Sequence, residues 1–171
     1  MRTLSCLIVV GCVAAQGMVA QATPPPQRTI PCEEIIDFTP FPRLGSSNPR
    51  DQARLVLNSV MVPPAYLTQT APTGEKPWRY FSKHGMVVKS GKTVTITVPV
   101  AWRKHVGVSW GNGGHGVFHT IRFASCGSDP KRGDAYAGGF FLRSASACVP
   151  LIFSVGNRQQ KAWFGVGRRC R

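Results

Sequence analysis

The chain has 171 residues and carries 21 lysines and arginines against 7 aspartates and glutamates, so its formal net charge is +14 at pH 7. This length allows one domain, or one domain with a tail, and excludes large multidomain enzymes and most α/β barrels. The charge excludes an acidic or neutral surface, and the hydrophobic content of 43% argues against a disordered chain.

Residues 1–22 have the pattern of an export signal. Arg2 gives a short positive start, residues 4–19 are apolar and uncharged, and residues 20–22 (Ala-Gln-Ala) match a cleavage site. The apolar stretch is shorter than the ~20 residues that span a bilayer, so cleavage is favoured over a retained signal anchor. Cys12 ends a Val-Val-Gly-Cys sequence that offers lipid attachment as a further alternative. We therefore expect a secreted or envelope location, with no stable transmembrane helix after cleavage.

Cleavage removes two of the six cysteines and leaves Cys32, Cys126, Cys148 and Cys170. An even number of cysteines in an exported chain predicts two disulfides, for which three pairings are possible. We favour Cys126–Cys148, which would close a moderate loop between adjacent strands, and Cys32–Cys170, which would tie the two ends of the domain together. A zinc site is disfavoured, because the four cysteines are far apart and no C-x2-C spacing exists.

Residues 23–50 are rich in proline and include a run of three consecutive prolines. Proline fixes the backbone and removes a hydrogen-bond donor, so we expect an extended N-terminal segment that acts as a spacer. Glu33, Glu34 and Asp37 are expected to form a solvated cluster that partners some of the many cations. The folded domain is then expected at residues 51–171.

Beyond this segment the dominant sequence period is two. Residues 93–98 place Val94, Ile96 and Val98 on one face and threonines on the other, as in a half-buried strand. Similar apolar rows occur in residues 106–110, 117–123, 149–155 and 162–166. Turn signals separate these rows, and no window of helical length has a persuasive 3.6-residue period. The pattern predicts an all-β domain, an antiparallel β-sandwich (immunoglobulin-like) of about eight strands, with a barrel as the alternative.

Residues 107–111 (Gly-Val-Ser-Trp-Gly) match the G-x-S-x-G elbow of serine hydrolases. The elbow needs its serine on a strand-to-helix turn, and the glycine-rich stretch that follows cannot start a helix. We therefore predict no catalytic residue. A small secreted serine hydrolase, with Ser109 as nucleophile and His105, His115 or His119 as base, is the alternative.

The four histidines are the candidates for a metal site, which would be another alternative function. His115 and His119 are four residues apart, a spacing that suits zinc on a helix. On a strand the same spacing separates the Cα atoms by about 13 Å, too far for one ion unless the chain bends. His84 and His105 are the other candidate ligands, and on this geometry we predict no metal and no other cofactor.

Lysines and arginines are spread over the turns and strand ends. The anion-binding candidates are the doublets Arg103-Lys104 and Arg168-Arg169, the second lying in the densest basic stretch of the chain. Exposed aromatic rings can stack on sugars or hold cations. The aromatic-contact candidates are Trp78, Tyr80 and Trp163. Trp110 lies in an apolar row and is expected in the core.

Six short stretches resemble a family of uncharacterised exported proteins from actinobacteria. They are Val62-Pro63-Pro64-Ala65-Tyr66, Trp110-Gly111-Asn112, Arg122-Phe123-Ala124-Ser125-Cys126, Tyr136-Ala137-Gly138-Gly139-Phe140, Ala147-Cys148-Val149-Pro150-Leu151 and Phe164-Gly165-Val166-Gly167-Arg168-Arg169-Cys170. The resemblance covers about the last 120 residues. It implies export and one β-rich domain, and it carries no activity, ligand or site residue over to this chain.

These observations favour a secreted or envelope-associated, non-enzymatic binding module. A net charge of this size attracts polyanions, so the expected partners are anionic cell-wall or membrane-surface polymers. The chain has no dedicated nucleic-acid motif, and the sequence does not indicate an oligomeric state. A basic surface that only confers solubility, without a ligand, is the alternative.

Overall fold

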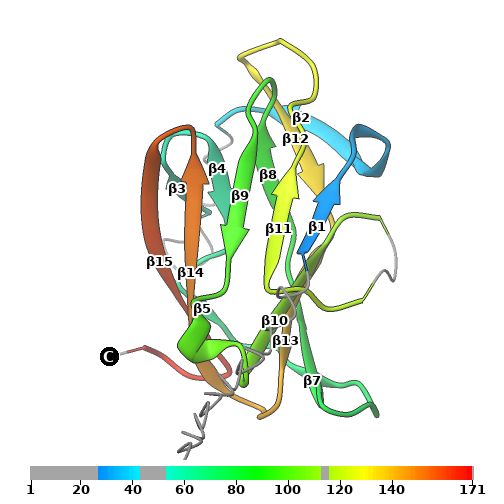
Figure 1. The fold of residues 1–171 in the computed structure, drawn as a ribbon, viewed down its shortest axis with the longest axis vertical. Helices are drawn as coiled ribbons and strands as arrows, with labels where there is room; N and C mark the ends of the chain where they lie inside the picture. Colours follow the sequence, from blue (N-terminus) through cyan, green and yellow to red (C-terminus); the bar gives the residue numbers. More distant parts are fainter. Residues whose placement is uncertain (1–26, 43–52, 113–115, 171) are drawn as a thin grey trace, which may run out of the picture.

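A computed structural model describes residues 27–42, 53–112 and 116–170 (Figure 1). The export signal expected at residues 1–22, the alternative lipid site at Cys12, and His115 lie outside the described residues. Within them the structure is all-β, with two short 3-10 turns, η1 (Cys32–Glu34) and η2 (Val100–Trp102), and no α-helix. None of the helical elements described could cross a membrane.

The described part of the chain contains fifteen strands. They are β1 (Gln27–Ile30), β2 (Asp37–Pro40), β3 (Arg54–Val56), β4 (Val60–Val62), β5 (Tyr66–Leu67), β6 (Ala71–Pro72), β7 (Tyr80–Lys83), β8 (Met86–Lys89), β9 (Val94–Thr97), β10 (Val106–Trp110), β11 (Thr120–Phe123), β12 (Arg132–Tyr136), β13 (Gly138–Leu142), β14 (Ala147–Val155) and β15 (Arg158–Val166).

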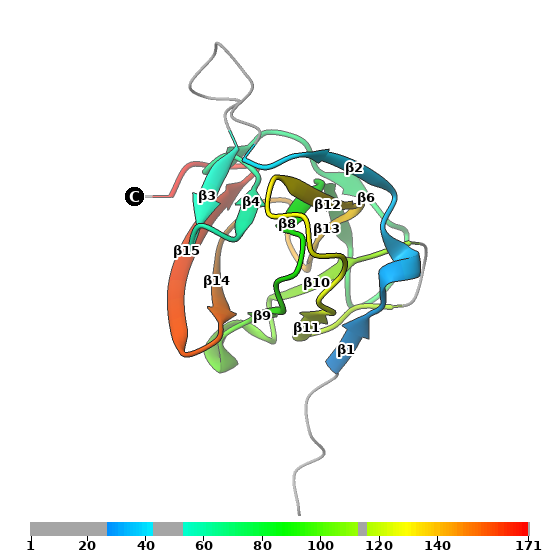
Figure 2. The same ribbon diagram turned by 90° about the horizontal axis from the view of Figure 1, so that it is seen from above.

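The strands form three sheets. The six-stranded sheet has the order β1-β11-β9-β14-β15-β5, the five-stranded sheet β2-β12-β8-β4-β3, and the four-stranded sheet β10-β13-β7-β6. Neighbouring strands are antiparallel except for two parallel pairs, β1 with β11 and β15 with β5. Seen from above, the sheets surround a common interior (Figure 2).

Alternating side chains fill this interior, as the sequence predicts. In β9, Val94 and Ile96 are fully buried, whereas Thr95 and Thr97, which alternate with them, are only half-buried. Trp110 of β10 and Phe164 of β15 are also buried, and all three sheets contribute to one continuous apolar cluster. Each large apolar side chain of this kind contributes about 2 kcal/mol when it leaves water.

The structure differs from the sequence-based expectation in strand number and domain extent. There are more than eight strands because many are only two to four residues long and some contain proline. β1 and β2 belong to the expected Pro-rich segment, yet β1 pairs with β11 and β2 pairs with β12. Ile30 is fully buried. The folded domain therefore extends back to β1, and residues 27–42 are not a spacer.

Two disulfides are confirmed, but the favoured pairing is wrong. Cys32 is bonded to Cys126 and Cys148 to Cys170, with Cα atoms 5.6 and 5.4 Å apart. Cys32 and Cys126 meet because each follows closely on one strand of the parallel pair β1 and β11. Cys148 lies opposite Gly165 in the β14–β15 ladder, and the chain turns back after β15 to reach it. Two disulfides are typical of an oxidising, extracytoplasmic setting.

Candidate functional site

Carboxylates are unevenly distributed along the chain. No aspartate or glutamate lies between Glu75 and Asp129 or after Asp134. Asp134 itself is buried and paired with Arg132 through an N–O distance of 3.2 Å. Lys161 of β15 and Lys104, which follows η2, therefore have no aspartate or glutamate near them in sequence, and their charge is available to an anionic ligand.

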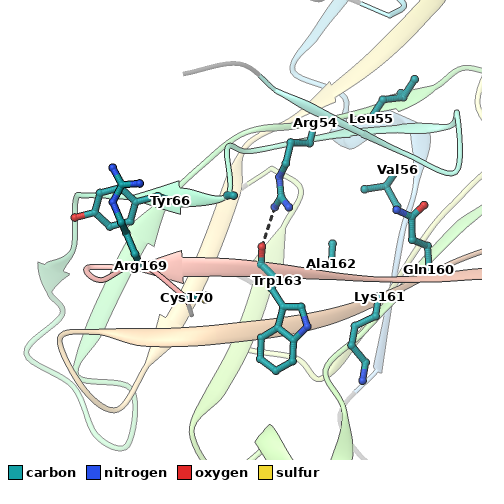
Figure 3. A pocket seen from close by; sticks show the side chains of 11 residues that line it. Arg54, Leu55, Val56, Tyr66, Gln160, Lys161, Ala162, Trp163, Arg169 and Cys170 are labelled. Carbon is teal, nitrogen blue, oxygen red and sulfur yellow. Dashed lines mark hydrogen bonds between the residues drawn. The ribbon is translucent and has the colours of Figure 1, made fainter. Parts of the chain in front are cut away.

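A pocket of about 510 Å³ lies between β3, β5 and β15 (Figure 3). We call its polar and charged lining residues, Arg54, Tyr66, Gln160, Lys161 and Arg169, the basic pocket. None of the described residues that line it is a carboxylate. An excess of positive charge with several hydrogen-bond donors suits a phosphate or carboxylate group.

Arg54 is the half-buried cation of the basic pocket. Its Nη2 donates to the carbonyl oxygen of Trp163 at 3.0 Å, and its Nε donates to that of Pro63 at 3.3 Å. The guanidinium lies 4.6 Å from the centroid of the Phe164 ring. Burial lowers the pKa of Arg54, although a guanidinium remains protonated in proteins. Because the described residues give Arg54 no carboxylate, a bound anion would offset part of the cost of burying its charge.

The C-terminal segment that follows β15 brings Arg169 to the same pocket. The Arg169 guanidinium lies over the ring of Tyr66, 5.1 Å from its centroid. The Cys148–Cys170 disulfide holds this segment against β14. The segment also packs closely over Gly165, where a Cβ atom would collide with its backbone. The position of Arg169 therefore depends on the disulfide and on the glycine.

The opposite side of β15 carries an aromatic contact. The side chains of Lys161 and Trp163 point to this side, away from the Arg54 guanidinium (Figure 3). Trp163 packs edge-on to Trp102 of η2, with ring centroids 5.9 Å apart, and remains 43% exposed. Cations and aromatic rings are thus present on both sides of this edge of the six-stranded sheet.

The structure places only part of the expected site at the basic pocket. Trp163 and Arg169 line it, while Arg168 is exposed beside Arg169 and does not. Lys104 is exposed two residues after the end of η2. Arg103 donates from Nε to a main-chain carbonyl two residues before η2, at 3.2 Å.

Trp78 and Tyr80 lie away from the basic pocket. Trp78 is edge-on to His119, with centroids 6.3 Å apart, and the Arg143 guanidinium lies 5.7 Å from its ring. Tyr80, in β7 of the four-stranded sheet, lines a different pocket together with Glu75. The three aromatic-contact candidates, Trp78, Tyr80 and Trp163, therefore do not belong to one site.

Sequence reasoning missed Arg54 and Tyr66. Arg54 is hydrogen-bonded to Trp163, which is 109 residues further along the chain. Tyr66 lies opposite Gly165 in the parallel pair of β5 and β15. No local sequence pattern marks either residue as part of a site, because the pocket exists only where the edges of two sheets meet.

Ser109 lies in β10 opposite Gly139 and is half-buried. It lines a second cavity of about 500 Å³ that also contains Glu75 and Lys83. Within the described ranges its hydroxyl makes no hydrogen bond to a histidine, and His115 lies outside them.

The described histidines do not meet at one point. No group of three or more His, Cys, Asp or Glu side chains that could hold a metal ion occurs in residues 27–42, 53–112 and 116–170. Burial lowers the pKa of His84. Burial also lowers the pKa of His119, with a smaller contribution from the charge of Arg103.

The fold and pocket define a class of molecule, a disulfide-bonded all-β domain with a basic cavity at a sheet edge. No known family model and no curated protein matches this sequence.

Proposed function

We propose that this protein is a secreted or envelope-associated, non-enzymatic module that binds anionic polymers of the cell envelope. The observation that carries the proposal is the basic pocket, where Arg54 and Arg169 face a cavity with no carboxylate among its described lining residues. Lys161 extends positive charge to the other side of the same strand. An extended polymer that crosses β15 would contact Arg54 and Arg169 on one side of the strand and Lys161 on the other. A single small ion could contact only one of these sides.

The extracellular part of the proposal is supported by the two disulfides, which are rare in reducing compartments. The export signal at residues 1–22 and the resemblance to exported actinobacterial proteins belong to the same proposal. The immunoglobulin-like form of the sandwich also stays a prediction, in which the six-stranded sheet would be one layer and the two smaller sheets the other. The shared core is what supports it.

The test is a calorimetric titration of the purified, disulfide-bonded protein with polyglycerol phosphate, a soluble phosphodiester polymer, at low and at high salt. Wild type is expected to bind, and binding should weaken steeply as salt rises. The double variant Lys161→Ala/Arg169→Ala should bind about tenfold more weakly, because charge-assisted hydrogen bonds to phosphate are lost.

The matched control is Lys92→Ala/Lys131→Ala, which removes the same charge from exposed positions in the turn between β8 and β9 and before β12. This variant should bind almost as tightly as wild type. Equal weakening in both double variants would show that only net charge matters and that the basic pocket is not a site. Binding that does not respond to salt would also contradict the proposal.

A further inference from the structure

Exposed apolar side chains gather at η2. Val100, the first residue of this turn, is 73% exposed, and Trp163 is 43% exposed. Trp102, the last residue of η2, lies edge-on to Trp163 and joins the two into one surface. We call Val100, Ala101, Trp102 and Trp163 the apolar patch. Figure 1 shows η2 at the end of the molecule opposite to the turn between β8 and β9.

Two exposed lysines of the described residues lie next to this patch along the chain. Lys104 is exposed two residues beyond η2, and Lys161 lies two residues from Trp163 on the same face of β15. No aspartate or glutamate occurs between Glu75 and Asp129 or after Asp134, so none lies on η2, β14 or β15. An apolar centre with lysines beside it complements a surface that is apolar inside and negatively charged outside.

We infer that the apolar patch and its lysines dock this protein on the surface of an anionic lipid bilayer. Tryptophan is favoured at the membrane interface, because its apolar ring can contact acyl chains there while its indole N–H stays hydrated. Val100 offers only methyl groups, which gain free energy from contact with acyl chains and nothing from a charged polymer. Lysines at the border attract acidic headgroups.

The geometry favours a bilayer over a sugar chain. Stacking on sugars needs open, flat ring faces, but the two indoles meet at an interplanar angle of 85° and Trp102 is half-buried. The most exposed apolar side chain at the patch is aliphatic. The inference goes beyond binding of soluble polymers, and it does not depend on Arg54, Tyr66 or Arg169.

The fold supplies an internal comparison. Ile36 and Phe38 are 53% and 56% exposed, so they present as much apolar surface as the patch residues. They lie near Glu33 and Asp37 in sequence, both exposed, whose charges oppose an anionic surface, and the cation that lies over Phe38, Arg132, is itself paired with Asp134. Exposure alone therefore does not select the patch, but exposure with a basic border does.

The experiment is sedimentation of the full, disulfide-bonded protein with vesicles of phosphatidylglycerol and phosphatidylcholine, with pure phosphatidylcholine vesicles as reference. Wild type should bind the anionic vesicles and not the neutral ones. V100S and W163S should each bind about tenfold more weakly, because one apolar side chain no longer leaves water. I36S should bind as wild type, and circular dichroism would show that all variants fold.

A second measurement separates insertion from surface attraction. Acyl chains brominated near the headgroup should quench tryptophan fluorescence of wild type and quench W163F less. Unchanged vesicle affinity in V100S, or an equal loss in I36S, would overturn the inference, as would absence of quenching. Binding of vesicles without binding of polyglycerol phosphate would contradict the proposed function alone. Binding of polyglycerol phosphate without binding of vesicles would contradict this inference alone.

Discussion

His84 lies in the turn between β7 and β8, with its ring half-buried. Its backbone is fixed on both sides, since its N–H donates to the carbonyl of Gly138 at 2.7 Å and its carbonyl accepts from Nε1 of Trp110 at 3.0 Å. The ring Nε2 is buried and has no hydrogen-bond partner in the described part of the chain. Burial therefore disfavours the charged imidazolium and lowers the pKa of His84.

This shift predicts acid sensitivity. The pKa of His84 is lower in the folded chain than in the unfolded chain, where it is about 6.5. Below that value the unfolded chain binds more protons, so the free energy of unfolding should fall as the pH drops from 7.5 to 5.5. His84→Gln should lose less stability over this range, as measured by urea unfolding. His119, with a pKa lowered mainly by burial, should supply the remaining slope. Identical losses in variant and wild type would contradict the argument.

At the scale of elements, the sequence predicts which side chains of a strand are buried, but not which strands pair with one another. The alternation in β9, β10, β14 and β15 predicts their core faces, because a period of two reports directly which side chains point inward. It does not report which strand lies next to which. Cys32 and Cys126 are 94 residues apart and meet only because β1 and β11 pair in parallel.

The same limit applies to the candidate site. Trp163 and Arg169 could be proposed from the sequence, since an exposed position in a strand and a dense basic tail are local features. Arg54 and Tyr66 could not, because β3 and β5 supply them from another part of the chain. A pocket between the edges of two sheets is a property of topology, and one sequence does not contain it as a pattern.

The two disulfides predict separable effects. Loop entropy gives about 3 kcal/mol for Cys148–Cys170 and about 5 kcal/mol for Cys32–Cys126, because the second closes the longer loop. Cys148→Ser/Cys170→Ser should therefore lower the free energy of unfolding less. It should nevertheless weaken binding of polyglycerol phosphate, since it releases the segment that holds Arg169 over Tyr66.

Cys32→Ser/Cys126→Ser is the matched comparison. Urea unfolding should show the larger loss of stability. Calorimetry on the folded fraction should show binding like that of wild type, because this disulfide follows β1 and β11, at one end of the six-stranded sheet, whereas the basic pocket lies at β15 and β5, at its other end. The reverse ranking of the two variants in binding would contradict a role for the C-terminal segment.

For the molecule as a whole, Phe164 joins the three sheets. It belongs to β15 of the six-stranded sheet and is fully buried. Its ring centroid lies 5.2 Å from that of Phe140 in the four-stranded sheet and 6.4 Å from that of Phe153 in β14. The guanidinium of Arg54, from the five-stranded sheet, covers it at 4.6 Å. One side chain therefore links the core of the fold to the basic pocket.

Phe164→Ala should lower the free energy of unfolding by about 4 kcal/mol, because it removes a large buried ring and leaves a cavity between the sheets. Phe164→Leu keeps most of the volume and should cost less than about 2 kcal/mol. Urea unfolding of both variants, followed by circular dichroism and by tryptophan fluorescence, should give coincident single transitions if the three sheets share one core. Phe164→Ala should also weaken polyglycerol phosphate binding, because Arg54 loses the ring on which it rests. Separate transitions for the two signals, or a small stability loss with unchanged binding, would show that Phe164 does not couple the sheets to the pocket.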